Sequence, residues 1–125
     1  MDEKEDKIKE ELKPIQKEVL AILLYGSSAK GESNERSDID ICIVAPHTDK
    51  KELYRKMLRL TRKNYDIKIF EDMPLFLKME VIKNHKIIYA KDIYDLHEYF
   101  YNFRKIWKDQ EHRQKLSQEE IKNLF

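Results

Sequence analysis

Short apolar runs separated by polar stretches set the hydrophobic pattern of this chain. The run at 19–25 is apolar at almost every position, which predicts a central strand that is covered on both faces. A second apolar run follows at 39–44, and 65–70 alternates polar and apolar side chains. A fourth short strand is predicted at 86–90. The pattern therefore predicts a small sheet of about four strands.

Between and after these strands, apolar residues recur every three or four positions, as they do on the inward face of a helix. This spacing predicts helices over 2–13, 49–63, 74–84 and 93–107. Aromatic residues, among them Tyr99, Phe103 and Trp107, are concentrated in the last of these, as core or as a surface for a partner. Pro14 is expected to stop or kink the first helix, and Ser117 with Glu120 forms a capping box that predicts a separate last helix.

Together these elements predict an α/β (α+β) fold in which the sheet packs against helices. The chain has 125 residues, enough for one domain with one core, so we expect a single domain over 1–125. Residues 93–125 would form a C-terminal helical extension of that domain.

Composition narrows the classes of function. Charged residues make up 39% of the chain but the net charge is only +1, which disfavours nucleic acid as a partner. The single cysteine, Cys42, excludes a disulfide framework. The charged start of the chain is unlike a signal peptide, and no apolar run reaches the roughly 20 residues of a membrane span. We therefore expect a soluble cytoplasmic protein without a membrane partner.

Two aspartates open the second predicted strand. Side chains alternate in a strand, so Asp38 and Asp40 project from one side while Ile39 and Ile41 fill the other. Two carboxylates ~7 Å apart on one face repel each other unless a cation lies between them. Oxygen ligands without a soft neighbour suit Mg²⁺ or Mn²⁺.

A candidate phosphate site lies just before these aspartates. Gly26 ends the first strand and allows a close backbone approach, and Ser27 and Ser28 add hydroxyl donors. Lys30 and Arg36 are cations in the segment that follows, although Arg36 also fits a solvated loop residue. A site for a nucleoside triphosphate with bound Mg²⁺ requires this order of elements: a strand, a phosphate-binding turn and a strand with Asp-x-Asp.

These residues resemble the signature of the minimal nucleotidyltransferases in the DNA polymerase beta superfamily. That signature is Gly-Ser, ten residues, then Asp-x-Asp, and here Gly26-Ser27 is followed after ten residues by Asp38-Ile39-Asp40. Ser28 and Lys30 stand where the family usually has arginines, and lysine lacks the bidentate fork of arginine.

The resemblance implies a polymerase-beta-like nucleotidyltransferase fold with a small mixed sheet, and ATP as substrate. It implies that Asp38 and Asp40 hold two Mg²⁺ ions roughly 3.5–4 Å apart. The third predicted strand supplies Asp66, which matches the family's third carboxylate as metal ligand or proton acceptor. Glu71 and Asp72 follow closely and remain alternatives for that role.

Members of the resembled family are often paired with a HEPN toxin and act as its antitoxin, some by moving AMP to a tyrosine of the partner. The resemblance thus implies transfer of NMP, most simply AMP, to a partner hydroxyl. Two other functions stay open: a module that neutralises a partner by contact alone, and a small transferase that modifies nucleic acid. A homo-oligomer is also compatible with the apolar C-terminal region.

Overall fold

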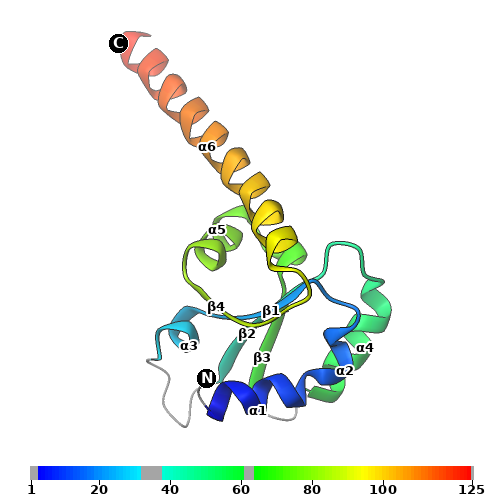
Figure 1. Ribbon diagram of the computed structural model, residues 1–125. Helices are drawn as coiled ribbons and strands as arrows, with labels where there is room; N and C mark the ends of the chain where they lie inside the picture. The colour runs from blue at the N-terminus through cyan, green and yellow to red at the C-terminus, as the bar shows by residue number, and fades with distance from the viewer. Residues whose placement is uncertain (1–2, 32–37, 61–63, 125) are drawn as a thin grey trace.

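The computed structural model describes residues 3–31, 38–60 and 64–124, with side chains described as far as residue 115. Elements follow in the order α1 (Glu3–Glu11), α2 (Lys13–Gln16), β1 (Ala21–Tyr25), α3 (Gly26–Lys30), β2 (Ile39–Val44), α4 (Lys50–Leu60), β3 (Tyr65–Ile69), the 3₁₀ turn η2 (Phe70–Asp72), α5 (Leu75–Lys83), β4 (His85–Ala90) and α6 (Ile93–Leu124). Figure 1 shows the strands at the centre of the molecule, with helices on both sides.

The four strands form one mixed sheet in the order β3-β2-β1-β4. β1 runs antiparallel to both β2 and β4, whereas β2 and β3 are parallel and are joined through the helix α4. All five residues of β1 are buried, so the prediction of a central strand covered on both faces is confirmed. The predicted mixed sheet of four strands packed against helices is confirmed as well.

Each face of the sheet carries its own hydrophobic cluster because the side chains of the strands alternate. On one face, Ile41 and Ile43 of β2 pack with side chains of α1, α2 and α4. On the other, Cys42 and Val44 pack with η2, α5 and the start of α6. A one-residue slip of β2 would exchange the two sets, so these clusters fix the register of the strand that carries Asp40.

The helices differ from the predictions at two places. The first helix ends at Glu11, and Pro14 lies in the first turn of the separate helix α2, where a missing backbone N–H costs nothing. The separate last helix predicted at Ser117 is wrong, because α6 continues unbroken to Leu124. No glycine or proline follows Pro74, so no strong helix breaker interrupts this segment.

The aromatic stripe of α6 belongs largely to the core. Leu96 and Phe100 are fully buried, and Phe103 packs edge-on against Phe70 with ring centroids 5.3 Å apart. The first turns of α6 therefore hold the helix on the sheet, while its distal part extends away from the body (Figure 1). Tyr99, Phe100 and Phe103 are thus part of the core, whereas Tyr94 and Tyr101 of the same helix stay exposed.

Candidate functional site

Two carboxylates meet on neighbouring strands. The parallel register of β2 and β3 places Asp40 directly beside Asp66, and both belong to the face of the sheet that also carries Cys42. Paired residues of adjacent strands lie about 5 Å apart at their backbones. Asp38 is exposed and lies two residues ahead of Asp40, just before β2 begins.

Gly26 fits closely against this carboxylate pair. It follows β1 directly, begins α3 and has a φ of +60°, a conformation that strains any residue with a Cβ atom. A Cβ atom built on Gly26 would lie 3.2 Å from Oδ2 of Asp40. Both the backbone conformation and the limited space therefore favour glycine at this position.

The short helix α3 is tied to the start of β2. The backbone N–H of Asp40 donates a hydrogen bond of 2.9 Å to Oγ of Ser28. Gly31 ends the helix in the left-handed conformation and donates its N–H to the carbonyl of Ser27. Ser28 thus has a definite contact, which positions the Asp40 backbone, and its hydroxyl proton is left for another acceptor.

The electrostatics of the site favour a bound cation. Partial burial and then the charge of Asp66 raise the pKa of Asp40, while the nearby Lys68 acts in the opposite direction. Burial, Asp40 and Asp66 also raise the pKa of the Tyr25 hydroxyl. Negative charge is therefore gathered here without an equivalent positive charge among the described side chains.

Sequence reasoning missed Tyr25 and Lys68 as members of this group. The alternation of side chains in β3 that places Asp66 on one face of the sheet also places Lys68 on that face, so the sequence pattern could have identified Lys68. Of the other predicted site residues, Ser27 and Lys30 are exposed on α3. Arg36 lies outside the described residues.

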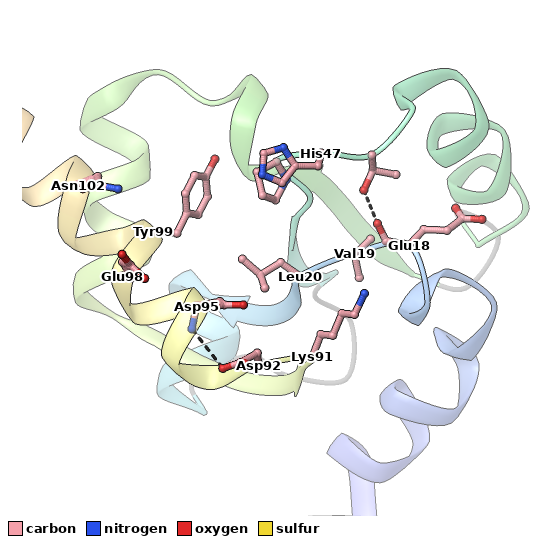
Figure 2. Close-up of a pocket in the computed structure, with 12 residues that line it drawn as sticks. Glu18, Val19, Leu20, His47, Lys91, Asp92, Asp95, Glu98, Tyr99 and Asn102 are labelled. Atoms are coloured by element: carbon pink, nitrogen blue, oxygen red, sulfur yellow. Dashed lines mark hydrogen bonds between the residues drawn. The ribbon is translucent and has the colours of Figure 1, made fainter.

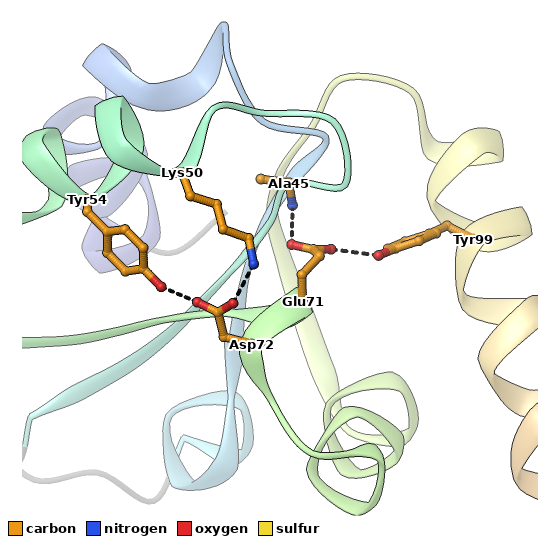
Figure 3. Close-up of polar contacts among 6 residues, drawn as sticks. All are labelled: Ala45, Lys50, Tyr54, Glu71, Asp72 and Tyr99. Atoms are coloured by element: carbon orange, nitrogen blue, oxygen red, sulfur yellow. Dashed lines mark hydrogen bonds and ion pairs between the residues drawn. The ribbon is translucent and has the colours of Figure 1, made fainter.

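The two alternatives to Asp66 lie elsewhere. Glu71 accepts the backbone N–H of Ala45 at 2.8 Å and the hydroxyl of Tyr99 at 2.7 Å, so it occupies the opposite end of β2 from Asp40. Asp72 is held by Lys50 at 2.6 Å and by the hydroxyl of Tyr54. Figure 3 shows both carboxylates facing these partners.

A pocket of about 690 Å³ lies at the end of the sheet remote from the two aspartates. Val19 and Leu20 line it just before β1, His47 comes from the loop after β2, and Asp95 and Tyr99 come from the first turns of α6 (Figure 2). These segments are far apart in sequence, which explains why no local pattern predicted the pocket. It is distinct from the carboxylate site.

The donor set of the site fits a hard divalent cation. Among the described residues, no three His, Cys, Asp or Glu side chains already converge on one point. Mg²⁺ rarely uses an all-protein cage and commonly combines one or two carboxylates with substrate phosphates. The side-by-side carboxylates of Asp40 and Asp66 are suited to that shared arrangement.

Comparisons with known proteins show the family of this chain. The profile of the family described as "Polymerase beta, Nucleotidyltransferase" matches residues 6–94. The chain belongs to this nucleotidyltransferase family. The matched segment contains all four strands and every described residue of the candidate site.

A relative of this nucleotidyltransferase in Methanocaldococcus jannaschii is 53% identical over 95 residues, which cover 76% of this chain and 75% of the relative. The name of that relative describes it as a proposed protein adenylyltransferase.

Solved structures share the fold. A crystal structure of a toxin–antitoxin with AMP-PNP contains a chain with a TM-score of 0.67 and 21% identity, covering 94% of this chain and 97% of its own. A second, of the tri-AMPylated Shewanella oneidensis HEPN toxin in complex with an MNT antitoxin, gives a TM-score of 0.63 at 18% identity, covering 94% of each chain. Within the described part of the nucleotidyltransferase, no helix is both long and apolar enough to cross a membrane.

Proposed function

We propose that this nucleotidyltransferase moves AMP from ATP to a hydroxyl group of a protein, most specifically a tyrosine of a HEPN-type toxin, and so acts as its antitoxin. Family membership supports nucleotidyl transfer. The name of the M. jannaschii relative supports a protein acceptor, and the description of the Shewanella complex supports AMP and a HEPN partner.

The observation that carries the proposal is the pairing of Asp40 with Asp66 beside Gly26. The metal would be held by Asp38, Asp40 and Asp66. It would consist of two Mg²⁺ ions, or of Mn²⁺ in their place. When bound, the metal would neutralise charge on the phosphates of ATP. Burial and then the negative charge of Asp66 raise the pKa of Asp40, and a cation would offset the repulsion between the two carboxylates, so they would gain from binding one.

The backbone at the β1–α3 junction would hold the triphosphate. Gly26 leaves room for a phosphate to approach the chain, and the hydroxyls of Ser27 and Ser28 can donate to phosphate oxygens. Lys30 adds positive charge at the end of α3, with Arg36 as a further candidate.

In the reaction, the acceptor oxygen forms a bond to the α-phosphorus of ATP while the bond to the bridging oxygen of the β-phosphate breaks. Pyrophosphate leaves, and the proton of the acceptor hydroxyl passes to Asp66 or to solvent. Asp66 suits this role because it is only partly buried and lies directly beside Asp40 in the sheet.

The test is to incubate a small amount of this protein with a HEPN-type partner and ATP-Mg²⁺ and to measure the mass of the partner. We expect one or more AMP additions, with the partner inactive after this protein is removed. The variant Asp66→Asn should lose transfer by at least about a hundredfold. Glu71→Gln is the matched control, because Glu71 lies at the other end of β2, and it should retain transfer.

If the partner gains no mass with any nucleotide and regains activity on separation, this protein neutralises it by contact and the proposal is wrong. Mass on RNA instead of protein would show a nucleic-acid-modifying enzyme. Loss of transfer in Glu71→Gln alone, with its fold kept, would show that Asp66 is the wrong carboxylate.

A further inference from the structure

The outward side of α6 carries a second regular stripe. Six exposed residues recur at intervals of four, three, four, three and four positions, which is the spacing of one seam of a coiled coil. This outer stripe consists of Tyr94, Glu98, Tyr101, Lys105, Lys108 and His112. It lies on the far side of the helix from Leu96 and Phe100, which pack on the sheet.

The outer stripe exposes large aromatic side chains, which are unusual on a helix face that contacts only solvent. Tyr94 is 82% exposed and Tyr101 is 55% exposed. Figure 1 shows α6 projecting from the body, so its outward side is open to a second helix. Exposed aromatic side chains in a regular helical seam are typical of a surface that meets a partner.

The order of side chains in the outer stripe identifies that partner. Residues of the outer stripe that lie the same number of positions before and after Phe103 have complementary chemistry. Glu98 of one copy would face Lys108 of a second copy and form an ion pair with it. The ring of Tyr101 in one copy would face the ammonium group of Lys105 in the second copy, which is a cation–aromatic contact.

The last symmetric match joins Tyr94 with His112, which is also favourable. Two copies of α6 that cross antiparallel near residue 103 would therefore form every one of these contacts twice. A parallel pairing would instead place Glu98 on Glu98 and Lys105 on Lys105, which repel.

One of these contacts already occurs within the chain. Nζ of Lys105 lies 5.5 Å from the ring centroid of Tyr101, one turn away on the same helix. In an antiparallel pair the same ring would also be within reach of Lys105 from the second copy. The cation–aromatic contact proposed for the centre of the pair thus already occurs between these two residue types on α6.

We propose that the outer stripe binds a second copy of this chain, forming a two-fold symmetric dimer through antiparallel α6 helices. The contact is one helix wide, so the dimer should be weak, reversible and sensitive to salt. The inference rests on α6 alone and does not depend on the proposed transfer reaction.

Sedimentation equilibrium of the full chain, from micromolar to millimolar concentration, tests the dimer. The variant Lys108→Glu turns both symmetric ion pairs into like-charge contacts and should raise the dissociation constant at least about tenfold. Arg113→Glu is the matched control, since it makes the same charge change about 100° around the helix from His112, and it should leave association unchanged.

The double variant Glu98→Lys, Lys108→Glu restores both pairs with their charges exchanged and should recover the wild-type dissociation constant. At concentrations low enough for the monomer to dominate, thermal melting should be unchanged in all variants because these side chains are exposed. A chain that stays monomeric at millimolar concentration overturns the proposal, and so does equal weakening by Lys108→Glu and Arg113→Glu. If these variants change only the affinity for a HEPN-type protein, the stripe binds that partner instead.

Discussion

Replacing Gly26 by alanine tests whether the close contact between the β1–α3 junction and Asp40 controls the site. Gly26 and Gly31 both have positive φ, +60° and +71°, but against the described part of the chain only a Cβ on Gly26 meets another atom, Oδ2 of Asp40 at 3.2 Å. Gly31→Ala therefore carries backbone strain alone and is the matched control.

The expected magnitudes follow from these two geometries. Strain at positive φ costs about 1–2 kcal/mol, and the lower entropy of the unfolded alanine chain offsets about 0.4–1 kcal/mol of it. Gly31→Ala should thus lower the free energy of unfolding by about 1 kcal/mol. Gly26→Ala should lose about 1 kcal/mol more, because Asp40 has to move away from the added methyl group. At about 4 °C per kcal/mol for a domain of this size, the expected losses in Tm are about 4 and 8 °C.

The assay combines urea unfolding with AMP transfer to the partner. Transfer should fall at least about tenfold in Gly26→Ala and stay near wild type in Gly31→Ala, since only the first change displaces Asp40. If both variants lose the same stability and the same activity, the 3.2 Å contact has no consequence and the reasoning fails.

Three further predictions concern the carboxylates. Asp40→Asn should abolish transfer yet raise the Tm of the metal-free protein at pH 7, since the repulsion with Asp66 disappears; a lower Tm would contradict this. Tyr99→Phe removes one donor to Glu71 and should cost about 1–2 kcal/mol in urea unfolding, with transfer kept, whereas no loss would show that the hydrogen bond is not formed in solution. Hydrogen bonds from Lys50 and a tyrosine lower the pKa of Asp72, so its contribution to stability is present above the ordinary carboxyl pKa of about 4 and is lost as pH falls. Asp72→Asn should therefore lower Tm slightly at pH 7 and leave it unchanged at pH 2, and an equal loss at both pH values would refute the pairing.

Sequence patterns correctly predicted the features of the fold that depend on residues close together in sequence. The alternation around Asp40 and Asp66 gave the direction of both side chains, and β2 and β3 confirm it. The capping box at Ser117 failed because a local cap signal does not end a helix that has no breaker. The contact between Gly26 and Asp40 and the remote pocket depend on tertiary approach of distant segments, which no local spacing encodes.

The parallel pairing of β2 with β3 has a consequence for the order in which the molecule opens. Among the described strands, β3 lies at the edge of the sheet and pairs with β2 alone, and the connection between these two strands runs through α4. β1, in contrast, is paired on both sides. Edge elements open at lower free energy than central ones, and non-local pairings form late in folding. Departure of β3 alone would separate Asp66 from Asp40 while most of the core persists. Amide protons of β3 should therefore exchange faster than those of β1, and heating should inactivate the site before the protein unfolds globally.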